Sequence, residues 1–209
     1  MSLVIAIDGP AAAGKGTLAR RLASELGLRY LDSGLLYRAV GRRVLDRGAD
    51  PSDPAIAETE AERLQPEDLA RPDLRGPAAD AASSAVAAHP GVRARLLAFQ
   101  RLFPGEVGAV LDGRDIGTVV FPEAPLKLFV TASPAARAER RWRELGGAVP
   151  LTQVEAEMRA RDQRDSNRGT APLRMADDAV LLDTTALDAE AAFELARRIV
   201  RERLGRAAD

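Results

Sequence analysis

The chain has 209 residues, of which 46% are hydrophobic and 29% are charged, a balance that suits one globular core and argues against extensive disorder. Its 30 basic residues nearly match its 31 acidic residues, so net charge gives no reason to expect nucleic-acid or membrane binding. The absence of cysteine and the presence of one histidine, His89, exclude disulfides, thiol nucleophiles, Ser-His-Asp triads and histidine-clustered metal sites. No apolar run suits a membrane span or a signal peptide, so we expect a soluble, cytoplasmic protein.

Five short apolar segments are predicted to form β-strands. They are nearly uninterrupted instead of alternating with polar residues, which is typical of parallel strands covered on both faces. Helical patterns separate them, so the sequence predicts an α/β fold with a doubly wound, five-stranded parallel sheet. The strand segments are residues 3–7, 28–31, 107–111, 126–130 and 179–182.

Periodicity and capping residues predict the helices. Apolar residues three and four apart indicate helices over 15–26, 33–45 and 190–204. Ser133 before a proline predicts a helix N-terminus. Thr152, three residues before Glu155, predicts a capping box at the start of another helix.

Two long stretches do not fit a simple alternation of strands and helices. One, between the second and third strands, is punctuated by prolines and should form several short helices; the other, between the fourth and fifth strands, is rich in arginine. We interpret both as excursions from the sheet that build a substrate site. The resulting prediction is a single domain over 1–209, with a core of 1–37, 105–140 and 175–209, a monophosphate-binding region of 38–104 and a lid of 141–174.

The first predicted strand runs into a glycine-rich loop that ends at a lysine and a helix. Strand, Gly-x-x-x-x-Gly-Lys and helix, in this order, form the phosphate-binding loop of nucleotide-binding proteins. Its backbone N–H groups point at an anion, the helix N-terminus adds partial positive charge, and Lys15 reaches the β- and γ-phosphates. The predicted ATP-binding residues of the loop are Gly9, Pro10, Ala11, Ala12, Ala13, Gly14, Lys15, Gly16 and Thr17.

The position after Lys15 departs from the usual loop, because it holds Gly16 instead of a serine or threonine that would ligate Mg²⁺. Gly-Lys-Gly-Thr is more similar to the nucleoside monophosphate kinases than to the GTPases. We expect Thr17 and Asp112 to hold Mg²⁺ through water, with Asp112 after the third strand as a Walker B-like acid. The alternative is that Asp112 and Gly113 form a turn after that strand.

Three further polar segments are candidates for substrate binding. Ligands of open α/β sheets bind beyond the carboxyl ends of the strands, so residues 31–38 and 112–118 should face the phosphate loop. Residues 161–168 carry arginines three and four apart, which a helix would aim at one place. An exposed arginine stripe is the plain alternative, but after a phosphate loop we favour bidentate phosphate recognition.

Together these segments resemble bacterial cytidylate kinases. The resemblance covers most of the chain, with the motifs in the family's order, and implies ATP- and Mg²⁺-dependent phosphorylation of CMP and dCMP. The motifs that carry it are Asp8-Gly9-Pro10 with Gly14-Lys15-Gly16-Thr17, Leu31-Asp32-Ser33-Gly34 with Tyr37-Arg38, Asp112-Gly113-Arg114-Asp115-Ile116-Gly117-Thr118, and Arg161-Asp162 with Arg164-Asp165 and Asn167-Arg168.

The resemblance also implies roles for individual residues. Those that would read cytosine are Ser84 (with Ser83 as the adjacent alternative), Arg93 and Asp115. Those that would bind the rest of the acceptor are Ser33, Tyr37, Arg38 and Arg114 at the nucleotide and its phosphate, Arg161 and Asp165 at the sugar, and Arg168 near the phosphates. Those on the donor side and lid are Arg137, Arg140 and Arg141, and the catalytic set is Lys15, Arg114, Arg164 and Arg168.

The chemistry of the base agrees with that assignment. Cytosine presents an amino donor at N4 and acceptors at N3 and O2, which suit the Asp115 carboxylate and the Arg93 guanidinium. Uracil would place its O4 acceptor against the acid.

In one region the chain departs from the family, which typically carries a small β insertion in the monophosphate-binding region. Residues 64–83 show no alternating apolar run, so we expect loop and helix there.

Other functions stay open at this point. One is another small P-loop kinase acting on UMP, AMP or a non-nucleotide acceptor; another is a non-catalytic nucleotide-binding switch. A GTPase-type switch would read guanine through Asn-Lys-x-Asp, and the only asparagine, Asn167, is followed by arginine. We expect a monomer whose partners are ATP, CMP and dCMP, with no nucleic acid and no membrane.

Overall fold

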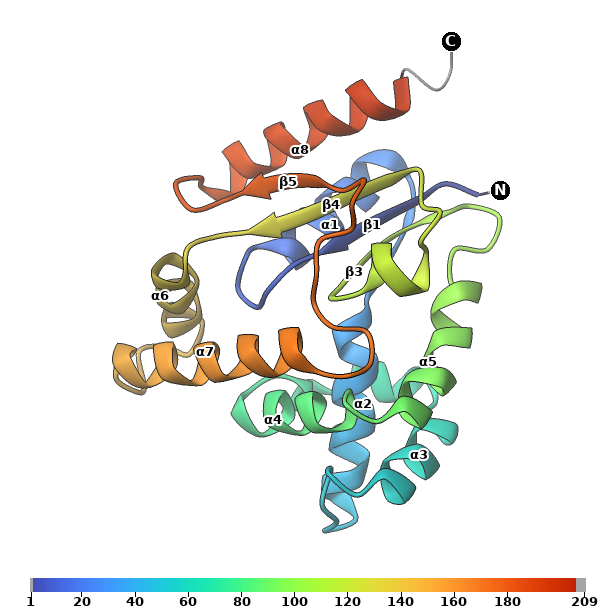
Figure 1. Ribbon diagram of the computed structural model, residues 1–209, viewed down its shortest axis with the longest axis vertical. Coiled ribbons are helices and arrows are strands. Elements are labelled where there is room, and N and C mark those ends of the chain that lie inside the picture. The colour runs from blue at the N-terminus through green and yellow to red at the C-terminus, as the bar shows by residue number, and fades with distance from the viewer. Residues whose placement is uncertain (1, 206–209) are drawn as a thin grey trace. The chain divides into compact units, whose positions relative to one another are not determined.

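The computed structural model describes residues 2–205, and Figure 1 shows its elements. The strands are β1 (Val4–Asp8), β2 (Arg29–Asp32), β3 (Ala109–Gly113), β4 (Leu126–Thr131) and β5 (Val180–Asp183). The helices are α1 (Lys15–Leu26), α2 (Ser33–Asp46), α3 (Pro54–Glu62), η1 (Pro66–Ala70), η2 (Pro72–Leu74), α4 (Pro77–Val86), α5 (Pro90–Leu102), η3 (Ile116–Val120), α6 (Pro134–Glu144), α7 (Leu151–Asn167) and α8 (Ala189–Leu204).

The strands form one sheet in the order β2-β3-β1-β4-β5. β1 lies at its centre, pairs in parallel with β3 and with β4, and is buried along its whole length, as is β3; β4 pairs in parallel with β5. The predicted five-stranded α/β fold is confirmed, and each strand lies within two residues of its predicted bounds. Long apolar runs predicted these strands because a central parallel strand is covered on both faces.

The chain divides into two compact units, which we describe separately. The first comprises the described residues up to 31, residues 103–167 and those from 171 onward, and the second comprises 32–102 and 168–170. In the first, α1 and α8 pack against each other over the sheet (Figure 1). Their apolar stripes, with Leu22 and Phe193 at the centre, bury a core against Ile5, Val110 and Leu128.

In the second unit, α2 packs against α4 and α3 against α5. The first pair approaches closely at Gly41, where a Cβ would lie 2.8 Å from the Cβ of Ala82. Residues 64–83 hold η1, η2 and the start of α4, with no strand among them. This confirms the expectation of loop and helix in place of the family's insertion. None of the helices in the described part of the chain is long and apolar enough to span a membrane.

The helix ends show which local predictions were correct. Ser133 accepts a hydrogen bond from the Ala136 N–H and caps α6, as predicted. The predicted capping box at Thr152 is wrong, because α7 already begins at Leu151. The carbonyl of Pro150 accepts from the N–H groups of residues 153 and 154, so Thr152 lies inside the first turn.

Candidate active site

The phosphate loop joins the buried strand β1 to α1 in the first unit. Gly9, with φ of 148°, and Gly14, with φ of 89°, adopt backbone conformations that favour glycine. Gly9 also has no room for a side chain, since a Cβ there would lie 1.9 Å from the carbonyl oxygen of Val130 on β4. The first glycine of the motif is therefore required by contact with the sheet as well as by its backbone angle.

Lys15 is the first residue of α1 and is buried. Its Nζ donates to the carbonyl oxygen of Pro10 at 2.8 Å, which bends the side chain back over the loop. The ammonium charge is thereby held beside the loop backbone and the N-terminus of α1. These three sources of positive potential together favour a phosphate group.

Asp112 lies within β3 instead of after it, and its carboxylate is buried. The Tyr30 hydroxyl donates to its Oδ1 at 3.0 Å, and its Oδ2 lies 3.8 Å from the point where a Gly16 Cβ would be. Within residues 2–205, no cluster of three acidic or histidine side chains could hold a metal alone. Mg²⁺ usually takes one or two carboxylates together with substrate phosphates, so a carboxylate beside the start of α1 fits this ion.

The segment after β3 is held by Asp8, the last residue of β1. Its carboxylate accepts hydrogen bonds from the N–H groups of Ile116, at 2.8 Å, and Gly117, at 2.7 Å. Burial raises the pKa of Asp8 to about 6, while the two N–H groups and Lys15 oppose the rise. The sequence motif includes Asp8, but sequence reasoning assigned it no role. An acid that ends a wholly apolar strand was the available signal.

Two predicted acceptor residues of the first unit meet directly. Arg114 donates through Nε to the Asp165 carboxylate on α7 at 2.9 Å, and both side chains are largely buried. The expectation that one helix carries all three arginines of residues 161–168 is wrong. α7 ends at Asn167, so Arg168 lies outside it, and Arg164 is exposed. The helical spacing stops there because the chain bends at the following residue, a glycine.

Arg137 connects the phosphate loop with α6 and α7. It is buried on α6, and its guanidinium donates to both carboxylate oxygens of Asp162, at 3.2 and 2.7 Å, and to the carbonyl of Ala11 at 3.3 Å. The other two predicted donor-side arginines have different contacts. Arg140 donates to the carbonyls of Thr184 and Leu187, and Arg141 pairs with Glu144.

Two further predicted acceptor residues lie in the first unit, Asp115 directly before η3 and Arg161 on α7. The second unit holds the others: Ser33, Tyr37 and Arg38 on α2, Ser84 on α4, Arg93 on α5, and Arg168. The Arg93 guanidinium lies 5.5 Å from the centroid of the Tyr37 ring. Arg38 donates to Asp80 on α4 at 2.8 Å, and its buried Nε has no acceptor among the described residues. Sequence reasoning missed Asp80, although it lies one helical turn before Ser84. An aromatic ring beside one guanidinium, and a second arginine with a spare donor, suit a planar, anionic ligand.

Comparisons with known proteins establish the family. The cytidylate kinase family model matches residues 5–202. The chain is 62% identical over 206 residues to a cytidylate kinase of Granulibacter bethesdensis, covering 97% of this chain and 99% of the relative. It is 61% identical over 208 residues to one of Paramagnetospirillum magneticum, covering 96% and 98%. The chain belongs to the cytidylate kinase family.

Membership of the cytidylate kinase family confirms the family predicted from the sequence motifs. A shikimate kinase from Acinetobacter baumannii, solved in complex with shikimate, has the same fold, with a TM-score of 0.50 at 19% identity. The alignment covers 99% of this chain and 95% of that one. At this identity the likeness extends to the P-loop kinase fold alone.

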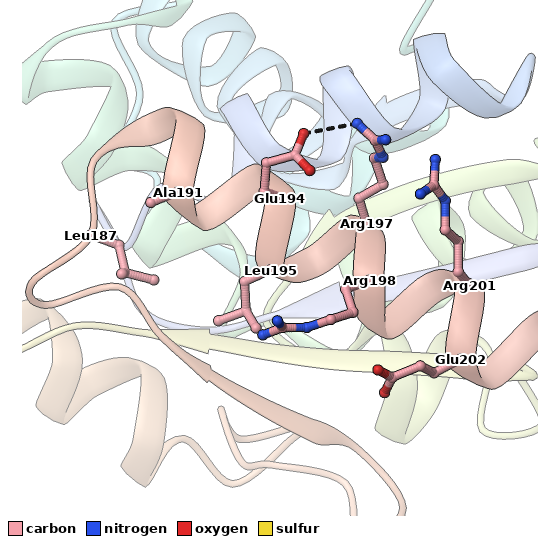
Figure 2. Close-up of a pocket in the computed structure, with 8 residues that line it drawn as sticks. All are labelled: Leu187, Ala191, Glu194, Leu195, Arg197, Arg198, Arg201 and Glu202. Atoms are coloured by element: carbon pink, nitrogen blue, oxygen red, sulfur yellow. Dashed lines mark hydrogen bonds and ion pairs between the residues drawn. The ribbon is translucent and has the colours of Figure 1, made fainter.

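A pocket on the surface of α8 lies outside the motifs of the cytidylate kinase family. Figure 2 shows Glu194 and Arg197 paired there; their Oε1 and Nη1 atoms lie 2.8 Å apart. None of its lining residues is among the predicted site residues. They are Leu187, Ala191, Glu194, Leu195, Arg197, Arg198, Arg201 and Glu202.

Proposed function

We propose that this protein transfers the γ-phosphoryl group of ATP to CMP or dCMP, giving ADP and the corresponding diphosphate. The observation that carries the proposal is the cytidylate kinase family match over residues 5–202. The phosphate loop, with Lys15 buried at its end, supports the nucleoside triphosphate as donor. The cation–π contact between Arg93 and the Tyr37 ring supports a planar base as part of the acceptor.

On the donor side, the loop backbone holds the β- and γ-phosphates and Lys15 neutralises their charge. Asp112 and Thr17 would hold Mg²⁺ through water, and the ion would supply further charge neutralisation between the phosphates. Arg137 donates a hydrogen bond to the Ala11 carbonyl and so helps to hold the loop in place. The proposed donor set is residues 9–17 with Arg137 and Arg141.

On the acceptor side, the nucleophile is a phosphate oxygen that already carries negative charge. Catalysis therefore needs no general base, and the chain's residues act by positioning and by charge stabilisation. We assign charge stabilisation to Lys15, Arg114, Arg164 and Arg168. The proposed acceptor set is Ser33, Tyr37, Arg38, Ser84, Arg93, Arg114, Asp115, Arg161, Asp165 and Arg168.

The proposal extends to the organisation of the protein. Residues 38–104 serve as the monophosphate-binding region, 141–174 as a lid that excludes water, and 1–37, 105–140 and 175–209 as the core of a single domain. Excluding water matters because the same loop could otherwise transfer the phosphoryl group to water. We further propose that the protein acts as a cytoplasmic monomer on free nucleotides.

The experiment that tests this function is an assay of ADP release from ATP with a panel of acceptors. CMP and dCMP are expected to give the highest kcat/KM, with UMP, AMP, GMP and shikimate far below them. Faster turnover of UMP, AMP or shikimate would favour a different small P-loop kinase. ATP binding without turnover of any acceptor would favour a nucleotide-binding switch.

Replacing Asp115 with asparagine is expected to relax the choice of base. The carboxylate accepts a hydrogen bond from the cytosine amino group but cannot donate one to the O4 acceptor of uracil. An amide can accept from the first and donate to the second. The ratio of kcat/KM for CMP to that for UMP should fall by about 5- to 150-fold, the effect of one unpaired buried polar group. Steady-state kinetics with both acceptors measures it. An unchanged ratio of kcat/KM for CMP to that for UMP would show that Asp115 does not take part in base recognition.

A further inference from the structure

Asp8 is the buried acid that the proposed mechanism does not use. It ends β1, so the phosphate loop begins at the next residue, and it is only 5% exposed. Both carboxylate oxygens are engaged, one with the N–H of Ile116 and the other with the N–H of Gly117. One side chain therefore connects the start of the phosphate loop with the first two residues of η3.

The contact fixes a short segment whose position bears on substrate binding. Between β3 and η3 the chain has only Arg114 and Asp115, the two residues of the first unit proposed for the acceptor phosphate and the base. β3 holds the segment at one end through its pairing with β1. Asp8 holds it at the other end, because two charge-assisted hydrogen bonds to successive N–H groups fix both the position and the direction of the backbone.

Gly117 completes this arrangement. A Cβ there would lie 3.0 Å from Cδ of Lys127 on β4 and 3.3 Å from Oδ2 of Asp8. The residue is thus held between the aliphatic part of one side chain and the carboxylate of another. A glycine lets the backbone approach Asp8 as closely as the 2.7 Å hydrogen bond requires.

We propose that Asp8 is a positioning residue of the kinase, which sets Arg114 and Asp115 relative to the phosphate loop through its hydrogen bonds to Ile116 and Gly117. This inference rests on the proposed function, since it concerns the binding of the acceptor nucleotide. Asp8 itself touches neither the donor nor the acceptor in this scheme. Its removal acts on the acceptor through the two residues that it places.

The charged groups around Asp8 make the effect selective. Lys15 on α1 attracts its negative charge, Asp115 repels it, and Lys127 faces Gly117 from β4. The strand neighbours of Asp8 are Gly113 and Phe129, which carry no charge. Removing the carboxylate removes a negative charge from beside the phosphate loop, so binding of the anionic donor is not expected to weaken.

The kinetic test compares Asp8→Asn with the wild-type protein. Asparagine keeps the size of the side chain but places an NH₂ group against one of the two N–H groups. The KM for CMP is expected to rise by about tenfold, within the range for an unpaired buried group, while the KM for ATP stays within about threefold. Asp188→Asn is the matched control, since Asp188 caps α8 and has no place in the site.

A second variant, Gly117→Ala, keeps the carboxylate and displaces the backbone from it. It is expected to reproduce the selective rise in the KM for CMP. Equal KM values for CMP in the wild type and in a folded Asp8→Asn protein would overturn the inference, as would equal rises for CMP and ATP. If the wild-type protein does not phosphorylate CMP at all, the proposed function fails instead, and the acceptor panel shows this independently.

A readout without substrate separates positioning from simple structural support. The amide ¹H and ¹⁵N resonances of Ile116 and Gly117 in the free wild-type protein should titrate together with a midpoint at the pKa of Asp8, about 6. The Asp8→Asn protein should lack this titration. Amide resonances of Ile116 and Gly117 that are the same in the wild-type and Asp8→Asn proteins at neutral pH would show that the carboxylate does not hold the segment, and would overturn the inference.

Discussion

Lys15→Met is expected to lower kcat by about 10²- to 10³-fold, the usual cost of removing one preorganised charge from a site where negative charge develops. The side chain is buried at the start of α1, and its Nζ is already held over the loop by the Pro10 carbonyl. No large rearrangement is then needed to place the charge beside the β- and γ-phosphates. Methionine keeps the length and the apolar part of the side chain but removes the ammonium group.

The measurement is ADP release at saturating CMP, with ATP binding followed by calorimetry and folding by thermal denaturation. The melting temperature should change little, because methionine keeps the buried apolar part of the side chain at this position. Lys15→Arg is the matched variant, since it keeps the charge but replaces the compact ammonium group with a planar guanidinium group. Its turnover should fall between those of the other two proteins. A Lys15→Met enzyme with wild-type turnover would contradict the assignment of the loop.

Gly9→Ala is expected to destabilise the fold by about 4 kcal/mol or more, which places it among the most damaging single substitutions. A Cβ at this residue would lie 1.9 Å from the backbone oxygen of Val130, so a strand must move, and φ of 148° strains any other residue. At about 2–4 °C for each kcal/mol in a chain of this size, the melting temperature should fall by about 8 °C or more.

Gly27→Ala separates the cost of backbone strain from the cost of the steric clash that a Cβ at Gly9 would make with Val130. Gly27 ends α1 with φ of 65°, and a Cβ there would meet nothing within 4 Å. Its replacement should cost only about 1–2 kcal/mol, the penalty for a left-handed conformation. Both variants are compared by urea and thermal unfolding. Equal losses in the two proteins would mean that β4 does not constrain the loop.

Asp8 also gives stability a pH dependence that can be measured without substrate. Because burial raises its pKa from 3.8 to about 6, the ionised form is the less favourable one in the folded protein. Its contribution to stability is therefore complete below about pH 4 and is lost as the pH rises through about 6, amounting to about 3 kcal/mol in all. The Asp8→Asn protein does not lose stability in this way as the pH rises. Its melting temperature should therefore equal or exceed that of the wild type at neutral pH, and the difference between the two melting temperatures should become smaller in acid. A variant that is less stable by the same amount at every pH would contradict this account.

The sheet and the phosphate loop could be read from the sequence because local patterns determine them. Buried parallel strands need apolar runs, and a loop that cradles phosphate needs glycine where φ is positive, as at Gly14. The motifs also identified the family. The two local errors have a common cause. The start of α7 at Leu151 and its end before Arg168 depend on where the backbone begins and stops its turns, and spacing does not show this.

The contacts of the charged residues could not be read in the same way. The pairing of Arg114 with Asp165 joins residues 51 apart, and that of Arg137 with Asp162 joins residues 25 apart. The sequence motifs singled out Arg114, and the resemblance implied a donor-side role for Arg137, but nothing in the local sequence shows which carboxylate each of these arginines contacts. Asp8 was missed for a related reason, because its partners are backbone N–H groups more than a hundred positions away. Long-range polar contacts need the fold to be known first.

The contact between Gly9 and β4 has a mechanical consequence. A loop that abuts a neighbouring strand cannot shift along the sheet, so the donor cradle is a fixed reference within its unit. In the proposed reaction, the phosphates of the donor would therefore bind to a loop whose position relative to β4 does not change.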